Sequence, residues 1–302
     1  MTQATAQPRR YQATLALDAR ATLGECIRWD ERQKLIYWVD IPGRQLHRYD
    51  PATGRDDAMP LAQEMGCFAL AERGGFICGM RSGYARLDRF GGDFTPLASP
   101  DYDPAKARFN DGRCDSAGRF WAGTMWEPRD RAGGIVYRLD ADGRFGAQCN
   151  PVIIANGITF APDGRSMTLA DTTNHVLWAF DYDLVTGIPS SRRELRSYEP
   201  ASGRPDGACV DAEGNVYVAI MAGGRVEKIS PTGELLALIE LPIPNITCCT
   251  FAGDDLRTLY ITTARTRMTD AELAAHPYAG GLFVWRLPDG DAPGIIEPRY
   301  AG

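Results

Sequence analysis

The feature that most constrains this chain is a weak repeat that recurs six times along its 302 residues. Each copy begins with a polar or small residue, called the head here, and continues as a short apolar strand, a turn and a second apolar strand. Successive heads are 41, 44, 46, 50 and 41 residues apart, which is the period of a four-stranded blade in a β-propeller. The heads are Glu25, Gly66, Asn110, Asn156, Asp206 and Thr247.

The repeat predicts an all-β fold, a six-bladed β-propeller of four-stranded blades. Because the first strand of every blade lines the central channel, heads that are far apart in sequence meet at one site. The repeats leave no room for another fold, so we expect a single propeller domain over residues 1–302, with residues 1–10 as a flexible N-terminal segment.

The ends of the chain are expected to close the ring. The sixth repeat lacks an evident fourth strand, whereas YQATLALDA, residues 11–19, forms a strand pattern with no partner. Docking this segment into the last blade removes two exposed strand edges. The C-terminal GIIEPRY, residues 294–300, competes for the same role.

Two further elements follow from local patterns. PVIIA, residues 151–155, is predicted to be the outermost strand of the third blade. MTDAELAAHP, residues 268–277, has a threonine cap, acidic residues in its first turn and a terminating proline. This pattern is typical of one short helix in a loop.

Composition excludes several classes of partner. A formal net charge of −6 argues against nucleic-acid and anionic-membrane surfaces, which would repel the chain. No stretch approaches the roughly 20 apolar residues needed to span a bilayer, and the N-terminus lacks the apolar run of a signal peptide. Five of the eight cysteines lie in first strands and none forms a C-x-x-C pair, which favours reduced core thiols in a cytoplasmic protein.

Four of the six heads carry carbonyl or carboxylate oxygen. Glu25, Asn156 and Asp206 offer two carboxylates and one amide, and Asn110 is a fourth donor nearby. Oxygen ligands suit a hard or borderline divalent ion such as Ca²⁺, Mg²⁺ or Mn²⁺. The alternative is that these side chains only cap strand ends and bond to loop backbone.

Other chemistry-bearing residues add to or limit this prediction. The only histidines, His47, His175 and His276, are not heads, so a three-histidine zinc site and a Ser-His-Asp arrangement are disfavoured. Arg108 lies two residues before Asn110 and shares its face on an extended chain, where it could hold a hydroxyl-rich or anionic substrate or form an ordinary salt bridge. Glu127, after the second strand of the third repeat, lines the same mouth or is simply exposed.

The segments around the heads carry a family resemblance. ATLGECIRWD, ARFNDGRCDSAGRFWAGTM, NGITFAPDG and RPDGACVDAEGNVYVA resemble the SMP-30/gluconolactonase family, also called regucalcin-like lactonases, and the resemblance covers essentially the full chain. It implies a six-bladed propeller with one divalent cation bound by Glu25, Asn156 and Asp206. Arg108 and Asn110 match the substrate-side residues of the family, and an acidic substrate contact falls at Glu127 or a neighbour.

The resemblance also implies an activity. We expect a metal-dependent hydrolase that opens a sugar (aldono-) lactone to the aldonic acid in aldose catabolism, with Asp206 deprotonating the attacking water. The metal could be Ca, Mg, Mn, Zn or Fe(II). The rivals are a phosphotriester or aryl-ester hydrolase on the same fold and a non-enzymatic calcium-binding propeller.

Two details of the sequence bear on this activity. Many relatives have glycine after the first ligand where this chain has Cys26, and we expect the change to alter packing beneath the metal. The substrate, a small-molecule sugar lactone, is expected to be selected by loops over the mouth. These are residues 125–134, 172–176, 199–205 and 264–280.

Overall fold

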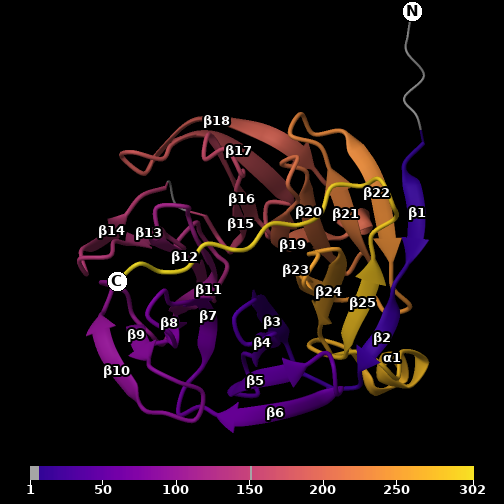
Figure 1. Ribbon diagram of the computed structural model, residues 1–302, viewed down its shortest axis with the longest axis horizontal. Coiled ribbons are helices and arrows are strands. Elements are labelled where there is room, and N and C mark those ends of the chain that lie inside the picture. The colour runs from indigo at the N-terminus through magenta and orange to yellow at the C-terminus, as the bar shows by residue number, and fades with distance from the viewer. Residues whose placement is uncertain (1–6, 150–151) are drawn as a thin grey trace, which may run out of the picture.

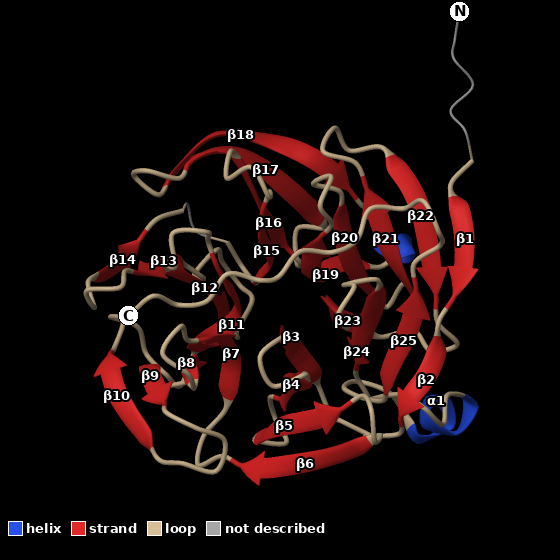
Figure 2. Cartoon of the chain, in the orientation of Figure 1, coloured by secondary structure: helices blue, strands red, loops and turns tan. Residues whose placement is uncertain are grey.

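The computed structural model describes residues 7–149 and 152–302, and over that part of the chain it is a nearly all-β ring around a central channel (Figures 1 and 2). Six sheets follow one another in sequence order as the blades, with the first strand of each innermost. The predicted six-bladed β-propeller is therefore confirmed. The first blade contains β3(Gly24–Asp30), β4(Leu35–Asp40), β5(Gln45–Asp50) and β6(Arg55–Pro60), and the second contains β7(Met65–Leu70), β8(Phe76–Met80), β9(Gly83–Leu87) and β10(Phe94–Ala98). The third blade contains β11(Ala107–Cys114), β12(Phe120–Trp126), β13(Val136–Leu139) and β14(Phe145–Ala147). The fourth contains β15(Ala155–Phe160), β16(Ser166–Asp171), β17(Val176–Asp183) and β18(Ile188–Ser197).

The N-terminal segment closes the ring, as the unpaired strand pattern predicted. The fifth blade runs from β19(Arg204–Val210) through β20(Val216–Met221) and β21(Arg225–Ile229) to β22(Leu235–Glu240), and the sixth contains β23(Ile246–Ala252), β24(Thr258–Thr263) and β25(Leu282–Arg286). β2(Thr14–Leu17) pairs antiparallel with β25 and supplies the missing fourth strand. β1(Arg9–Gln12) pairs in parallel with β22, so one N-terminal segment covers two neighbouring blades.

The structure also bears on two local expectations. Strand β1 begins at Arg9, inside the segment expected to be flexible, while residues 1–6 of that segment lie outside the described residues. The outer strand of the third blade is β14, whereas Val152 and Ile154 of the predicted strand 151–155 form only isolated bridges. Pro151 lies outside the described residues.

The short helix is confirmed as α1(Asp270–Ala275). The Thr269 hydroxyl accepts from the backbone N–H of Glu272, and the Glu272 carboxylate accepts from that of Thr269. This reciprocal capping box stabilises a helix too short to persist alone. One 3₁₀ turn, Pro200–Ser202, lies between β18 and β19.

A register shift occurs at the head of every blade. In each of the six pairings between a blade's first and second strands, the ladder is interrupted at or directly beside the head residue. Such a β-bulge bends the strand and re-aims a side chain. The bulges therefore explain how polar heads on otherwise apolar inner strands come to face the channel mouth.

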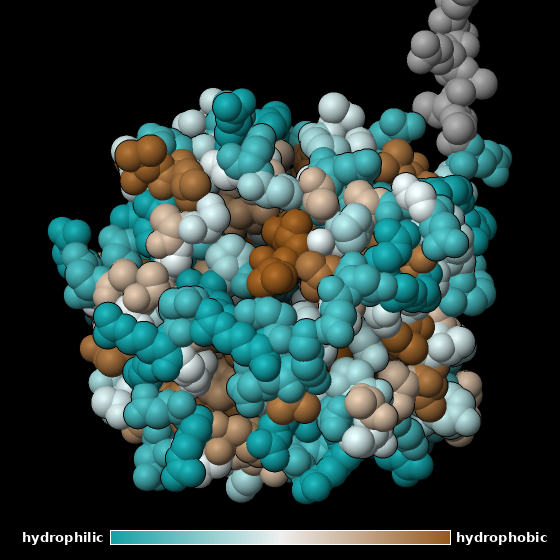
Figure 3. All heavy atoms as spheres, viewed as in Figure 1, coloured by the Kyte–Doolittle hydropathy of each residue, from teal (hydrophilic) through white to brown (hydrophobic). Residues whose placement is uncertain are grey.

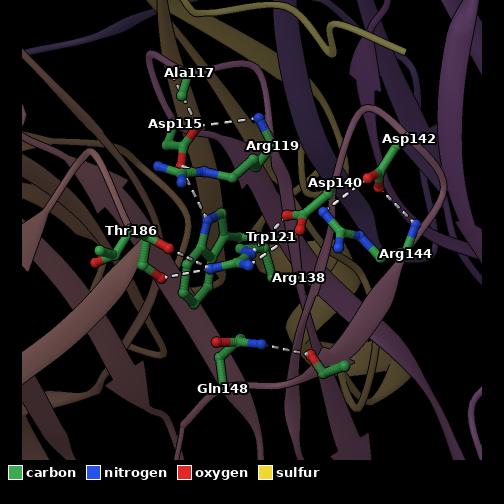
Figure 4. A network of polar contacts seen from close by, with 12 residues as sticks. Asp115, Ala117, Arg119, Trp121, Arg138, Asp140, Asp142, Arg144, Gln148 and Thr186 are labelled. Carbon is green, nitrogen blue, oxygen red and sulfur yellow. Dashed lines mark hydrogen bonds and ion pairs between the residues drawn. The ribbon is translucent and has the colours of Figure 1, made fainter.

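Turns between the first two strands are held by buried aspartates. Asp115 accepts backbone N–H bonds from Ala117 and Arg119 at 3.0 Å each, and its second oxygen accepts from Arg119 Nε at 2.6 Å (Figure 4). Arg119 also donates to the Leu184 carbonyl of the next blade. Arg138 donates to the Gly187 carbonyl of the same loop, so this network fastens the third blade to the fourth.

The C-terminal strap, residues 293–301, crosses one end of the channel (Figure 1). It does not add a strand to the last blade. Its backbone bonds to the turns that follow the first strands, including Glu72 N–H to the Tyr300 carbonyl and Ala301 N–H to the Gly118 carbonyl. Because the heads lie at the opposite ends of those strands, the strap and the heads mark the two ends of the channel.

Charged side chains occupy this end of the channel beneath the strap. Arg28, Arg113 and Glu297 are called the floor here. Glu297 of the strap forms ion pairs with Arg28, at 3.1 Å, and with Arg113. It also accepts from the Thr250 hydroxyl. The two arginines are 2% and 5% exposed. Beside the floor lies a cavity of about 220 Å³ lined largely by apolar residues, and the strap face shows an apolar patch near its middle (Figure 3).

No helix within the described residues is long and apolar enough to cross a membrane. All eight cysteines are free thiols, and seven of them are buried.

Candidate active site at the mouth of the channel

The heads open into a cavity of about 350 Å³ at the end of the channel away from the strap. All six residues predicted from sequence line it, so the structure brings the whole predicted set together. They are Glu25, Asn156 and Asp206, expected to bind a metal, and Arg108, Asn110 and Glu127, expected to contact substrate. Their individual roles stay predictions.

The two carboxylates of the site are buried charges without a cationic partner. Glu25 is 6% exposed and Asp206 5%, and neither forms a salt bridge with any described residue. Burial raises the pKa of Glu25 well above its ordinary value, and the negative charges of Asp206 and Asp111 raise it further. Burial and Asp111 raise the pKa of Asp206 in the same way. Two such carboxylates in mutual repulsion favour a bound cation.

A chain of hydrogen bonds fixes the amide side chains. Arg108 Nη1 donates to Asn110 Oδ1 at 2.8 Å, and Asn110 Nδ2 donates to Asn156 Oδ1 at 2.9 Å. Asn156 Nδ2 donates to the Thr172 hydroxyl at 2.7 Å, and that hydroxyl donates to the Pro205 carbonyl. The chain spans three blades and ends beside Asp206. It sets which end of the Asn156 amide presents oxygen.

Glu127 is held by an arginine that sequence reasoning did not identify. Arg81 Nη2 donates to Glu127 Oε1 at 2.8 Å, and its Nε donates to Glu64 Oε2 at 2.9 Å. The hydrogen bond from Arg81 lowers the pKa of Glu127, so this residue is a fixed carboxylate at the rim. Arg108 Nε lies 3.7 Å from Glu64 and 3.8 Å from Glu127, which is ion-pair range but too long for a hydrogen bond.

The residue after the first predicted ligand has a special backbone. Cys26 has φ +48°, a left-handed conformation that favours glycine. Its thiol accepts from the Phe68 backbone N–H at 3.1 Å and donates to the Phe68 carbonyl at 3.4 Å. These contacts join Cys26, beside Glu25, to the second blade.

The other two heads, Gly66 and Thr247, have structural roles and do not offer metal ligands. A side chain at Gly66 would meet the Phe109 carbonyl at 1.8 Å, so only glycine lets the second and third blades approach this closely. Thr247 is fully buried and donates to the Gly24 carbonyl, which joins the last blade to the first beside Glu25.

The predicted mouth loops all contribute to the cavity wall, through residues that sequence reasoning left unassigned. Glu64 and Arg81 had no signal, because neither lies in a repeat motif. The sequence prediction considered His175 in this loop and did not single out Thr172, but Thr172 lines the cavity and His175 does not. The unassigned lining residues in the four loops are Met125, Arg129, Thr172, Thr173, Arg204, Thr266 and Arg267.

The donor set is mixed. Among the described residues, no three or more His, Cys, Asp or Glu side chains cluster as a metal-binding group. The three histidines lie elsewhere, with His47 stacked on Trp38 at 3.7 Å and paired with Asp56. A cation at this mouth would therefore depend on Glu25 and Asp206 together with the amide oxygen of Asn156.

Comparison with known proteins places the chain in a family. Residues 23–265 match the family model described as "SMP-30/Gluconolactonase/LRE-like region". The chain is 44% identical to a 6-deoxy-6-sulfogluconolactonase of Pseudomonas putida over 93% of this chain and 96% of the relative. It is 34% identical to human regucalcin over 92% and 95%.

A solved structure is similar to this chain over nearly its full length. The calcium-binding protein regucalcin of Agrobacterium tumefaciens superposes with a TM-score of 0.92 at 26% identity, covering 98% of this chain and 100% of that one. The matched model spans every head from Glu25 to Thr247. The chain belongs to the SMP-30/gluconolactonase/LRE-like family.

Proposed function

We propose that this protein is a metal-dependent hydrolase that opens a sugar lactone to the aldonic acid. The observation that carries the proposal is the pair of buried carboxylates, Glu25 and Asp206, which lack a cationic partner at the base of a polar cavity. The relatives named gluconolactonase and regucalcin support the substrate class and the need for a divalent ion.

The donor chemistry fits one divalent cation. Glu25 and Asp206 supply two negative charges, and Asn156 supplies a neutral oxygen whose orientation is fixed by Thr172. All-oxygen ligation suits Ca²⁺, Mg²⁺ or Mn²⁺, and Zn²⁺ or Fe²⁺ is also compatible with carboxylates. When bound, the cation supplies Lewis-acid polarisation of the lactone carbonyl and lowers the pKa of water.

The chain's own residues then carry the proton and hold the sugar. Asp206 accepts the proton from the water whose oxygen attacks the lactone carbonyl carbon. The ring carbon–oxygen bond breaks, and the ring oxygen takes up the proton held by Asp206 and becomes a hydroxyl. Arg108 uses only Nη1 for hydrogen bonds within the described residues, so its remaining donors are available for sugar hydroxyls and the new carboxylate.

The amide chain couples substrate contact to the metal side. Asn110 receives from Arg108 and donates to Asn156, so a sugar that draws Arg108 toward it acts on the predicted ligand. Glu127, fixed by Arg81, presents an acceptor for sugar hydroxyls at the rim. A role in aldose catabolism follows from this chemistry. A cytoplasmic location is supported by the free thiols, which persist in reducing compartments.

The test separates Asp206 as a base from Asp206 as a ligand. We expect Asp206→Asn to keep the fold and lose about 10²–10⁴-fold in kcat for sugar lactones, the usual contribution of a positioned base. Metal content is measured on the same sample. Near-normal turnover in the metal-loaded variant would reject the base. Metal binding by the natural protein without opening of any lactone would favour the calcium-binding alternative.

A further inference from the structure

Three arginines on the cavity wall have no bonded acidic partner among the described residues. Arg129 follows β12, Arg204 begins β19 and Arg267 follows β24, and all three line the mouth cavity together with Arg108. None of the three forms a salt bridge or a side-chain hydrogen bond with any described residue. Arg81 at the same rim behaves differently, because it is bonded to both Glu64 and Glu127.

The three positive charges lie close enough to oppose one another. Burial lowers the pKa of Arg129, and the charges of Arg267, Arg204 and Arg108 lower it further, while the charge of Glu127 partly opposes them. Arginine remains charged in proteins, so this crowding is relieved by a bound anion and not by loss of a proton. The positive charge of Arg204 also reaches Asp206, which places the arginine wall next to the reaction centre.

Two of these arginines are held by unusual backbone. Arg129 has φ +57° and Arg267 has φ +61°, and residues with a Cβ avoid this left-handed region. Eight other non-glycine residues of the described chain share this conformation, so the backbone fixes where Arg129 and Arg267 start, and the cavity lining is what relates them to a ligand.

Counting the charged groups around the cavity shows an excess of positive charge. Arg81 and Arg108 balance Glu64 and Glu127 at the rim. A divalent cation balances Glu25 and Asp206. Even with the buried carboxylate of Asp111 counted against them, the charges of Arg129, Arg204 and Arg267 leave a positive excess that a neutral sugar does not neutralise.

We propose that the sugar lactone opened here carries a sulfonate or phosphate group on its carbon chain, bound by Arg129, Arg204 and Arg267. The inference rests on the proposed lactonase function. Sulfonate and phosphate present three acceptor oxygens, and the guanidinium fork donates to such groups through charge-assisted bonds. The lactone carbonyl then faces Glu25 and Asp206 while the anionic end faces the arginine wall.

The first test compares kcat/KM of the metal-loaded protein for three lactones: glucono-1,5-lactone, its 6-phosphate and its 6-deoxy-6-sulfonate. We expect the better of the two anionic lactones to exceed the neutral one by at least about 100-fold, because each charge-assisted bond is worth roughly tenfold or more. The phosphate and sulfonate arms identify which group is bound. A neutral lactone within about threefold of both anionic lactones would overturn the inference.

Variants test whether the named arginines are responsible. Arg129→Gln with Arg267→Gln should lower the ratio of kcat/KM for anionic over neutral lactone about 100-fold, mainly through KM. Placing Lys instead of Gln at position 267 of the double variant should restore part of this ratio. Arg265→Gln is the matched control, because it removes the same charge from the same loop but Arg265 does not line the cavity. An unchanged ratio in the double variant would contradict the proposal.

A binding measurement separates this inference from the lactonase proposal. Calorimetry with 6-phosphogluconate, 6-deoxy-6-sulfogluconate and gluconate needs no turnover, and the acids differ only at the anionic end. Affinity at least tenfold higher for an anionic acid, lost in the double variant, supports the arginine site even if no lactone is opened. Equal affinity for all three acids, with lactones still hydrolysed, removes the arginine site and leaves the lactonase standing.

Discussion

The two ends of the channel handle buried charge in opposite ways. At the floor, Arg28 and Arg113 are neutralised by Glu297 of the strap. At the mouth, Glu25 and Asp206 have no cationic partner. Less than a tenth of the surface is exposed for Arg28 and Arg113 at the floor and for Glu25 and Asp206 at the mouth, and the Glu297 side chain is 15% exposed. Burial alone therefore does not distinguish them, whereas pairing does.

This difference separates structure from function. A buried charge that the fold needs is paired within the fold, since an unpaired one costs several kcal/mol. A buried charge left unpaired lowers stability unless a ligand completes it. The floor is complete in the chain itself, whereas the mouth becomes complete only with a cation and, on our inference, an anion.

The largest effect is expected at the mouth. Glu25→Gln removes one of the two charges that hold the cation, so lactone turnover should fall on the order of 10³-fold through loss of metal. The metal-free variant should be at least as stable as the natural protein, because an unpaired buried charge is gone. Initial rates and urea unfolding of the metal-free proteins measure the two effects. A large loss of stability with metal affinity intact would contradict the contrast between the two ends.

The floor should show the reverse pattern. Glu297→Gln leaves Arg28 and Arg113 without their counter-charge, and we expect the free energy of unfolding to fall by about 3–5 kcal/mol. Turnover at 25 °C should change by less than about threefold, since the floor lies away from the mouth cavity. Thr250→Val is the milder control, because it removes one hydrogen bond to Glu297, worth about 1 kcal/mol.

A smaller effect is expected from a residue that positions a ligand. Thr172→Val keeps the shape of the side chain but removes the acceptor for Asn156 Nδ2. We expect divalent-ion affinity to fall about 10–100-fold, as for other groups that orient metal ligands. Ion titration followed by calorimetry measures it. Thr173→Val is the neighbouring control, and an equal loss in that variant would show that the hydrogen bond to Asn156 is not the cause.

The smallest effect is expected in the pH dependence of the stabilisation that the Glu297 ion pairs at the floor contribute. Burial works to raise the pKa of Glu297, but the charges of Arg113 and Arg28 outweigh it and hold the pKa below its ordinary value. Its stabilisation is therefore full above the unfolded pKa of about 4.3 and is lost as pH falls through the lower folded pKa. Unfolding at pH 7, 5, 4 and 3 should show the gap between the natural protein and Glu297→Gln narrowing. A constant gap would exclude this ion pair as the source.

The sequence predicted the fold and the mouth because both follow from a repeat. Each head occupies an equivalent position, and the ring brings equivalent positions together. The bulges at the heads were not visible in the pattern, although they are what aims Glu25, Asn156 and Asp206 inward. The β1 pairing was missed because residues 11–19 have the pattern of one strand and give no sign that two blades share it.

The floor and the arginine wall could not be predicted in the same way. Arg28 and Arg113 each lie three residues after a head on an apolar inner strand, which signals a buried charge that needs a partner. The partner, Glu297, comes from a strap outside the repeat. Arg129 and Arg267 lie in loops whose paths are set by tertiary contacts and not by periodicity.

The measurement that tests the central claim most directly is proton release from a panel of sugar lactones, neutral and anionic, by metal-free protein as single divalent ions are added. The natural protein should stay at the spontaneous rate until an ion is present and then saturate at about one ion per chain. Glu25→Gln should stay near the spontaneous rate at the same ion concentrations. Full turnover by the metal-free protein, or equal activation of Glu25→Gln, would contradict the account.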